Sequence, residues 1–282
     1  MESVLRQAYR GDWPAKLWQH WPGSCRVRCV RHELAWLSPQ SHALRIGFIS
    51  DLHLGPTTPP RLLEAAFAAL AQARLDVLLL GGDYVFVDAT REKASQLSDW
   101  IGRVPARLKL AVLGNHDLWT YHRVLEESLA RAGVEILSNR SLRLGALCEE
   151  LVIAGLDDPW TGEPNAGHAL RDVDDARVLV ILCHSPDGLP EVLRELRRQP
   201  RGEHRLYLCG HTHGGQIATP YGPIVVPGYV GKRYPHGMHR VGPVQLHVSR
   251  GVGATELPIR CYAPPEIAVI DLLPAAADPR GR

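Results

Sequence analysis

From residue 45 onward, short apolar runs alternate with polar stretches along the chain. Most of these runs are continuous in Val, Ile and Leu rather than alternating with polar residues. Continuous runs are typical of strands that are covered on both faces, as in layered α/β proteins. We therefore predict an α/β fold with strands at residues 45–50, 76–82, 109–114, 151–156, 177–183, 204–209, 244–249 and 266–272.

Four of the intervening stretches have helical composition: residues 60–73, 91–102, 119–132 and 188–199. The first begins after two prolines and continues RLLEAAFAAL, a proline start followed by strong helix formers. Residues 214–243 are rich in Gly and Pro and are predicted to form irregular loop.

The domain organisation follows from these shifts in composition. Residues 45–273 carry the strand and helix pattern and are expected to form one domain. Residues 1–44 form a separate basic, Trp-rich segment, and residues 274–282 a flexible tail.

Composition and charge narrow the class of protein. Hydrophobic residues make up 45% of the 282 residues, enough for one large core, and the net charge is only +2. Because there is no strong excess of basic residues, we expect no nucleic-acid partner.

Localisation signals and cysteines indicate the cellular compartment. There is no apolar run long enough to span a bilayer and no secretory h-region. The six cysteines are scattered along the chain, which suits reduced thiols in the cytoplasm. Cys25 and Cys29 are close enough for a disulfide or metal site, but no second pair accompanies them. The pattern does not indicate an oligomeric state.

Asp, Asn and His residues, whose side chains have similar chemistry as ligands, follow five of the predicted strands. The carboxyl ends of strands in open α/β sheets are where ligands bind, so these side chains are expected to converge. The residues concerned are Asp51, His53, Asp83, Asn115, His116, Asp117, His184, His211 and His213.

These residue types select metal chemistry. Carboxylate, amide and imidazole donors suit Mn²⁺, Fe²⁺, Co²⁺ or Zn²⁺, and there are too many donors for one ion with an open position. Two ions that share a carboxylate would use them well, and paired ions are a known device for hydrolysing phosphate esters. Each short motif alone is equally consistent with a surface turn, but the ordered set is not. Glycines among these motifs would let the backbone pass close to the ions: Gly81, Gly82, Gly114, Gly210, Gly214 and Gly215.

The ordered motifs DLH (51–53), GD (82–83), GNHD (114–117), CH (183–184) and GHTH (210–213) resemble the calcineurin-like metallophosphoesterase superfamily. The resemblance implies a four-layer α/β/β/α sandwich and two divalent ions, with Mn²⁺ expected first and Fe²⁺, Zn²⁺ or Co²⁺ also suitable. By position, one ion would be held by Asp51, His53 and His213. The other would be held by Asn115, His184 and His211, with Asp83 bridging the two.

The same resemblance assigns roles to two residues that do not bind metal. His116 would face the substrate phosphate and stabilise the transition state or protonate the leaving oxygen, and Asp117 would hold His116 in position. We therefore expect a two-metal-dependent hydrolase of a phosphodiester or pyrophosphate bond. Alternatives on the same site are a broad phosphodiesterase, a phosphomonoesterase or protein phosphatase, and a nuclease. A non-enzymatic metal-binding scaffold is a further alternative, although a scaffold has no need of His116.

A second resemblance concerns the substrate. The stretches GHTHGGQI, VSRGVG (248–253) and LPIRCYAPPEIAVIDL (257–272) are similar to a bacterial subfamily of envelope-associated phosphodiesterases. That subfamily includes enzymes of lipid A synthesis that convert UDP-2,3-diacylglucosamine to UMP and 2,3-diacylglucosamine 1-phosphate. The resemblance implies a phosphorylated small molecule or a nucleotide-linked lipid as substrate. Arg250, Lys232 and Arg233 are candidate substrate contacts, with a surface salt bridge or simple solvation as the alternatives.

The first 44 residues hold four of the seven tryptophans: Trp13, Trp18, Trp21 and Trp36. Leu5, Tyr9, Trp13, Leu17 and Trp21 recur at a spacing of four, as on one helical stripe, which Pro14 would interrupt or restart. Tryptophan beside basic residues is typical of interfacial membrane contact, so a cytoplasmic enzyme peripheral at the inner membrane is one interpretation. Packing of the stripe on the domain, with Trp36 in a strand, is the other.

Overall fold

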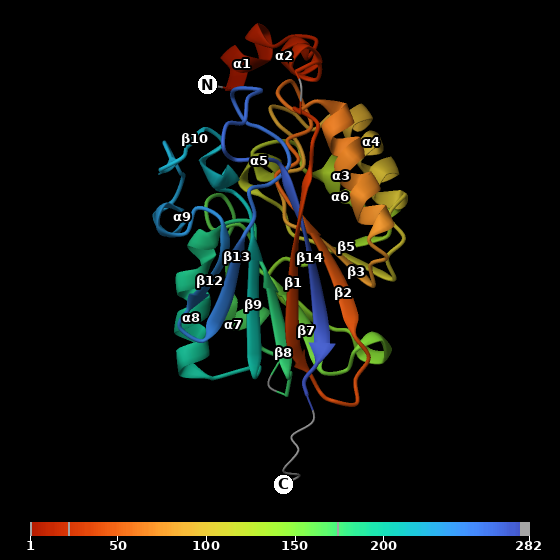
Figure 1. The fold of residues 1–282 in the computed structure, drawn as a ribbon, viewed down its shortest axis with the longest axis vertical. Coiled ribbons are helices and arrows are strands. Elements are labelled where there is room, and N and C mark those ends of the chain that lie inside the picture. Colours follow the sequence, from red (N-terminus) through yellow and green to blue (C-terminus); the bar gives the residue numbers. More distant parts are fainter. Residues whose placement is uncertain (1, 22, 174, 277–282) are drawn as a thin grey trace.

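The computed structural model describes residues 2–21, 23–173 and 175–276, and two six-stranded sheets form its centre (Figure 1). The strands of the first sheet are all parallel to their neighbours except at the pairing of β14 with β2. In spatial order they are β1 (Arg28–Leu37), β14 (Glu266–Pro274), β2 (Leu44–Ile49), β3 (Val77–Leu80), β4 (Leu108–Ala111) and β5 (Val134–Ile136).

The second sheet has a parallel centre and an antiparallel pair at each edge. Its spatial order is β12 (Gly237–Val241), β13 (Val244–Val248), β9 (His204–Cys209), β8 (Val178–Leu182), β7 (Leu151–Gly155) and β6 (Arg140–Arg143). Two short strands, β10 (Ala218–Thr219) and β11 (Gly222–Pro223), pair separately.

Helices cover the outer face of each sheet (Figure 1). The first sheet is covered by α3 (Pro60–Gln72), α4 (Arg91–Gly102) and α6 (Arg123–Arg131). The second is covered by α7 (Ala166–Ala169) and α8 (Leu189–Arg198). Three separate apolar clusters fill the spaces between these four layers. The predicted α/β/β/α arrangement is therefore confirmed.

Strand β3 shows why the buried strands are continuous apolar runs. All four of its residues are buried. Leu78 and Leu80 pack in the cluster beneath the helices, whereas Val77 and Leu79 pack against the second sheet. Because successive side chains point to opposite faces and both faces are dry, no position of the strand is left for a polar residue.

The predicted elements are present with shifted ends, and two predictions are wrong. The helix expected at 119–132 begins only at Arg123, as α6, and a separate short helix, α5 (Asn115–Leu118), precedes it. Residues 214–243, expected to be irregular, contain α9 (Tyr229–Arg233) and β12 as well as two short strands. Strand β12 lies at a sheet edge and is only partly buried, so it lacks the apolar run that marks a central strand.

The N-terminal segment is not one helical stripe. It forms two helices, α1 (Glu2–Ala8) and α2 (Trp13–Trp18), and the helical conformation is interrupted between them, where Asp12 has a φ of +56°. Pro14 lies in the first turn of α2, so it restarts the helix. Trp36 lies in a strand, as one interpretation required, and β1 forms an edge of the first sheet.

Both N-terminal helices lie at the end of the molecule that carries α5 (Figure 1). None of the described helices is long and apolar enough to cross a membrane. Most of the predicted flexible tail, residues 277–282, lies outside the described part of the chain. All six cysteines are free thiols, Cys25 and Cys29 included.

Candidate metal centre

The strand-end residues come together in one place. Asp51 and His53 follow β2, Asp83 follows β3, and Asn115 begins α5 after β4. His184 follows β8 in the second sheet, and His211 and His213 follow β9. The facing sheets thus bring donors separated by up to 162 positions, from Asp51 to His213, to the same edge of the sandwich.

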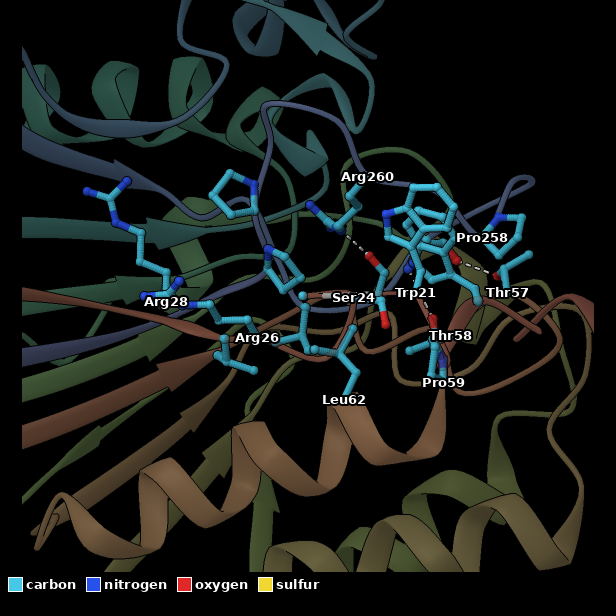
Figure 2. Close-up of a pocket in the computed structure, with 18 of the residues that line it drawn as sticks. Trp21, Ser24, Arg26, Arg28, Thr57, Thr58, Pro59, Leu62, Pro258 and Arg260 are labelled. Carbon is cyan, nitrogen blue, oxygen red and sulfur yellow. Dashed lines mark hydrogen bonds between the residues drawn. The ribbon is translucent and has the colours of Figure 1, made fainter. Parts of the chain in front are cut away.

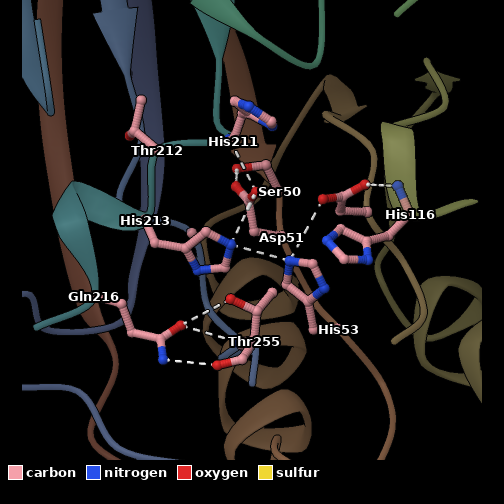
Figure 3. Close-up of polar contacts among 12 residues, drawn as sticks. Ser50, Asp51, His53, His116, His211, Thr212, His213, Gln216 and Thr255 are labelled. Carbon is pink, nitrogen blue, oxygen red and sulfur yellow. Dashed lines mark hydrogen bonds and ion pairs between the residues drawn. The ribbon is translucent and has the colours of Figure 1, made fainter. Parts of the chain in front are cut away.

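The first group of donors is Asp51, His53 and His213, all buried (Figure 3). The Nε2 atoms of His53 and His213 are 3.0 Å apart, and the two rings are stacked. Nε2 of His213 is 3.6 Å from Oδ1 of Asp51. The Ser50 hydroxyl donates to Oδ2 of Asp51, and the His211 amide donates to Oδ1, so this carboxylate is held firmly.

The second group is Asp83, His184 and His211, also buried. Nε2 of His184 is 3.1 Å from Oδ2 of Asp83 and 3.2 Å from Nδ1 of His211. Nδ1 of His184 is 2.9 Å from the carbonyl oxygen of Gly81, which orients the ring toward the carboxylate.

Asp83 connects the two groups. Its Oδ2 atom is 3.5 Å from Nε2 of His53 in the first group, in addition to its contact with His184 in the second. The arrangement is that of one carboxylate between two sets of imidazoles. Such a donor set can hold two borderline divalent ions.

The electrostatics of the imidazoles suit metal binding. Burial lowers the pKa of His53 and His213 well below the ordinary value and lowers the pKa of His211 to about 3. These rings are therefore neutral at physiological pH, which is the form that binds metal. Burial also opposes the charged form of His184, but Asp83, Asp51 and Asp158 outweigh it and raise that pKa well above its ordinary value. A metal cation near these carboxylates would supply the positive charge that protonated His184 supplies in its absence, so His184 could then bind the metal as a neutral ring.

Unsatisfied atoms point to the same conclusion. Among the described residues, Oδ1 of Asn115 and Nε2 of His211 are buried without a hydrogen-bond partner. A buried polar atom without a partner costs free energy, so each is suited to a ligand that supplies one. Asn115 lines the same pocket as Asp83 and His211. The residues present therefore fit a pair of metal ions.

Two glycines allow the backbone to approach the carboxylates closely. A Cβ at Gly210 would lie 2.0 Å from Oδ2 of Asp51, and one at Gly114 would lie 2.2 Å from Oδ1 of Asp83. Neither position has room for a side chain. Of the six predicted glycines, these two allow the close approach of one loop to another loop's donor carboxylate, whereas added Cβ atoms at Gly81, Gly82, Gly214 and Gly215 would meet other groups.

The backbone at the donors is strained. Asp51, His53, Asp83, His211 and His213 all have positive φ, between 43° and 70°. Residues other than glycine rarely adopt this conformation, and such strain is concentrated at functional sites. At each of these residues the backbone turns just after a strand, and the side chains point toward the shared group of donor atoms.

His116 lies beside the two groups without being fully buried. Its ring is 5.0 Å from the His53 ring, 5.4 Å from the Phe86 ring and 4.8 Å from the Trp119 ring, measured between centroids. Its amide donates to Oδ1 of Asp83 at 2.9 Å. His116 therefore faces the pocket from a fixed backbone position next to the shared carboxylate.

Asp117 organises the loops that carry its neighbours. Its carboxylate accepts hydrogen bonds from the amides of Asp83, Tyr84, Val85 and Gly114. Burial, and then the charge of Asp83, raise the pKa of Asp117 to about 7. These contacts fix the loop after β3 relative to the loop after β4, and through them the backbone that carries His116.

The three basic side chains that the sequence suggested as substrate contacts lie outside the pocket that contains His116. Nη1 of Arg250 is 2.6 Å from Oε2 of buried Glu266, so the guanidinium forms a salt bridge, partly buried rather than on the surface. Lys232 and Arg233 are exposed at the end of α9, and Arg233 lies over the Tyr234 ring. None of the three lines the pocket that contains His116.

Sequence reasoning did not single out four residues around the site. Nη2 of Arg260 is 3.0 Å from Nδ1 of His213, and the Trp160 ring lies 4.6 Å from the His211 ring. Asp158 is buried and accepts the amides of Trp160 and Thr161, and Trp119 packs on His116. Arg260 occurs within the motif LPIRCYAPPEI, whereas nothing in the local pattern marks the other three.

A pocket of about 430 Å³ opens onto the donors. Asp83, Asn115, His116, His211 and His213 form its polar floor. The rest of the lining is largely apolar, with Trp119, Trp160, Ile217, Ile224, Val225, Pro227 and Leu257, and it also includes the polar residues Thr212, Gln216, Thr255 and Glu256.

Comparison with known proteins gives consistent matches. A family model described as calcineurin-like phosphoesterase matches residues 44–215, which include every strand-end donor. The chain is 32% identical over 227 residues to the uncharacterized metallophosphoesterase YkuE of Bacillus subtilis, covering 79% of this chain and 77% of YkuE. It is 30% identical over 251 residues to the phosphodiesterase YaeI of Escherichia coli, covering 86% of this chain and 87% of YaeI. The solved 5'-nucleotidase precursor of Thermus thermophilus is 17% identical with a TM-score of 0.46, over 82% of this chain and 54% of that one.

Proposed function

Because the chain belongs to the calcineurin-like phosphoesterase family and is a metal-dependent phosphoester hydrolase of phosphodiesterase type, we propose that it cleaves the pyrophosphate of a nucleotide-linked lipid. UDP-2,3-diacylglucosamine is the substrate we propose, with UMP and 2,3-diacylglucosamine 1-phosphate as products. The reaction would belong to lipid A synthesis.

We assign the donors as follows. Asp51, His53 and His213 hold one ion, and Asn115, His184 and His211 hold the other. Asp83 bridges them, in keeping with its position between His53 and His184. Mn²⁺ is the proposed metal. When bound, the ions would supply positive charge to the phosphoryl oxygens and lower the pKa of a water molecule.

The protein's own contribution to the chemistry centres on His116. Its ring lies at the floor of the pocket, packed by Phe86 and Trp119, so it can be aimed at a phosphoryl group above the donors. We assign it to hydrogen-bond the phosphoryl oxygens and to give a proton to the leaving oxygen. Asp117 acts as a positioning residue, because it fixes the two loops on which Asp83 and His116 lie.

The apolar wall of the pocket is the observation that carries the lipid assignment. Ile224, Val225 and Leu257 line the pocket and are 65%, 72% and 47% exposed. Apolar side chains that stay exposed beside a polar floor suit a substrate that joins a phosphate to an apolar group. A purely polar phosphoester would leave this wall without a partner.

Contact with the inner leaflet of the membrane is a separate part of the proposal. Val4, Trp13 and Leu17 on the N-terminal helices are 66%, 49% and 66% exposed, and Trp21, just after α2, is 63% exposed. These helices lie at the same end of the molecule as α5, so a membrane touched by them would be near the pocket (Figure 1). Arg10 and Lys16 add positive charge that favours anionic lipid.

Membrane contact is tested with the double variant Trp13→Ser/Leu17→Ser, since deletion of residues 1–40 would also remove strand β1 from the first sheet. We expect the variant to sediment less with anionic phosphatidylglycerol vesicles while it hydrolyses a soluble aryl diester as fast as the parent. Unchanged sedimentation would refute membrane contact through this segment.

The substrate proposal is tested by turnover of UDP-2,3-diacylglucosamine by the purified chain. EDTA should abolish the release of UMP, and added Mn²⁺ should restore it. A soluble aryl phosphodiester serves as the control substrate. Metal-dependent hydrolysis of the aryl diester without any UMP release would refute the lipid assignment and leave a broad phosphodiesterase. Preference for aryl phosphate or for a polynucleotide would favour the phosphomonoesterase or nuclease alternatives.

A further inference from the structure

A second large cavity lies outside the metal centre, between the N-terminal segment and the body of the domain (Figure 2). Its volume is about 780 Å³. Residues from 18–21 and 23–29 form one side, and residues from 57–62 and 252–265 form the other. None of the metal-donor residues lines it.

Hydrogen bonds pin the N-terminal segment around this cavity. The Tyr9 hydroxyl donates to the Glu256 carbonyl at 2.7 Å, and the Ala15 amide donates to the Pro56 carbonyl at 2.9 Å. Beyond the cavity, the amide of Arg28 donates to the carbonyl of Pro265 at 2.8 Å. The segment is thus attached on both sides of a space that its own side chains do not fill. The cavity is partly open to solvent, and a concave space of this size suits a small ligand.

The lining of the cavity is mostly apolar. Leu62, Val252 and Ala254 are buried, and the Trp18 and Trp21 rings stack on each other at one side. Four prolines complete the lining: Pro59, Pro258, Pro264 and Pro265. The Thr57 hydroxyl donates to the Ala254 carbonyl, and the Thr58 hydroxyl accepts the Ala254 amide (Figure 2). Apart from the arginines, Ser24 and Tyr262 also bring hydroxyl groups to the lining, and the apolar part of the lining suits an aliphatic chain.

All the charged residues that line the cavity are positively charged. Its three charged residues are Arg26, Arg28 and Arg260, and no carboxylate lines it. Neither Arg26 nor Arg28 forms a salt bridge with any described residue, and both are exposed. Arg260 donates to the Gly253, Ala263 and Arg250 carbonyls, and its Nη2 atom lies 3.0 Å from Nδ1 of His213. The charges of Asp51 and Glu266 also act on it, so the positive charge open to a ligand is that of Arg26 and Arg28.

We propose that this cavity is a binding site for an acyl chain with an anionic head group, separate from the site that cleaves phosphoesters. The chain would lie against the prolines and Leu62, and Trp21 would cover it. The carboxylate or phosphate head would lie at the arginine side, where Arg26 and Arg28 are free to turn toward it. The proposal does not depend on which bond the enzyme hydrolyses.

Laurate is the probe, because it carries an acyl chain and an anionic head and contains no phosphoester bond. Binding is measured by isothermal titration calorimetry on the full-length protein below the micelle concentration, with and without Mn²⁺. We expect one site whose affinity falls as salt rises, since the arginines are exposed. Dodecyl maltoside, which has the same chain length without charge, and acetate, which has only the head, should both bind much more weakly.

Variants locate the site. Arg26→Gln/Arg28→Gln should weaken laurate binding about tenfold or more, because charge-assisted contacts are lost. Trp21→Ala should weaken it as well, and all these side chains are exposed, so folding should survive. Arg31→Gln on the same strand and Trp13→Ala on α2 are the matched controls, since neither residue lines the cavity, and both should bind like the parent.

Two outcomes would overturn the proposal. One is equal binding of laurate and dodecyl maltoside, which would mean non-specific adhesion to exposed tryptophans. The other is competitive inhibition of aryl diester hydrolysis by laurate, with an inhibition constant that equals its dissociation constant and is unchanged in Arg26→Gln/Arg28→Gln. That result would place laurate in the phosphoesterase pocket instead.

Discussion

Nε2 of His184 lies 3.1 Å from Oδ2 of Asp83, and both side chains are buried. The two residues come from different sheets, β8 and β3, so their contact joins the two halves of the sandwich at the metal centre. Because the same carboxylate oxygen also faces His53, a change at Asp83 should affect both halves of the donor set.

Asp83→Asn is expected to lower the bound metal from two ions to one or none and to reduce kcat/KM on an aryl diester by about 10³-fold or more, since a bridging charge is lost. Metal content is measured by elemental analysis after dialysis. Asp88→Asn is the control, because Asp88 pairs with Lys93 away from the donors. Full metal content in Asp83→Asn would refute the bridging role.

His116→Gln should separate catalysis from metal binding. We expect kcat to fall about 10²- to 10⁴-fold, the usual contribution of a positioned acid or base, with both ions retained. The rate should recover in part for substrates with a good leaving group such as nitrophenolate, since these need no proton. His122→Gln, on the same segment but outside the pocket, should behave like the parent. An equal loss for good and poor leaving groups would argue against proton donation.

Gly210→Ala tests the close approach of the loops. Its new methyl group would lie 2.0 Å from Oδ2 of Asp51 and 2.4 Å from Oγ of Ser50, so the carboxylate must move. We expect a loss of about 1–3 kcal/mol in the free energy of unfolding together with weaker metal binding. Gly102→Ala is the control, because nothing lies within 4 Å of its added Cβ at the end of α4, and there we expect no loss. Urea titration and metal titration give the two readouts.

Glu150 should make the stability depend on pH away from the metal centre. Burial alone would raise its pKa, but hydrogen bonds from Ser38 and Ser41 and the charge of Arg177 outweigh burial and lower the pKa in the folded state. A lowered folded pKa means stability that is present above the unfolded pKa and is lost as pH falls through the folded one. Glu150→Gln should therefore be about 1 kcal/mol less stable than the parent at pH 7.

That difference should shrink below a pH of about 4.5, where the unfolded carboxyl takes up its proton. Urea unfolding at several pH values gives the comparison. Glu149→Gln is a neighbouring control, and it should differ little from the parent at any of these pH values. A difference that stays constant with pH would show that the charge of Glu150 contributes nothing.

Much of the fold could be predicted because burial on both faces leaves a strong pattern. Strands β7 and β8, whose residues are all buried, are continuous apolar runs in the sequence. Edge strands are harder to predict. β12 and most of β1 are partly exposed and mix polar with apolar residues, so neither forms the continuous apolar run that marks a central strand, although alternate residues of β1 are partly buried. Pro14 predicts the interruption between α1 and α2, but not the left-handed turn at Asp12, because the spacing of four continues across a turn as readily as through a helix.

The sequence by itself determined the class of chemistry, because Asp, Asn and His at the ends of strands are the residue types that hold divalent metal ions, and their ordered motifs indicate a phosphoester hydrolase. Only the tertiary structure decided which donors meet, since Asp83 and His184 are brought together by the packing of two sheets. It also decided that Arg250 pairs with Glu266, whereas Arg260, from the same end of the chain, lies against His213. Such contacts cannot be predicted from local sequence, because each joins residues that are distant along the chain and depends on how the two sheets pack together.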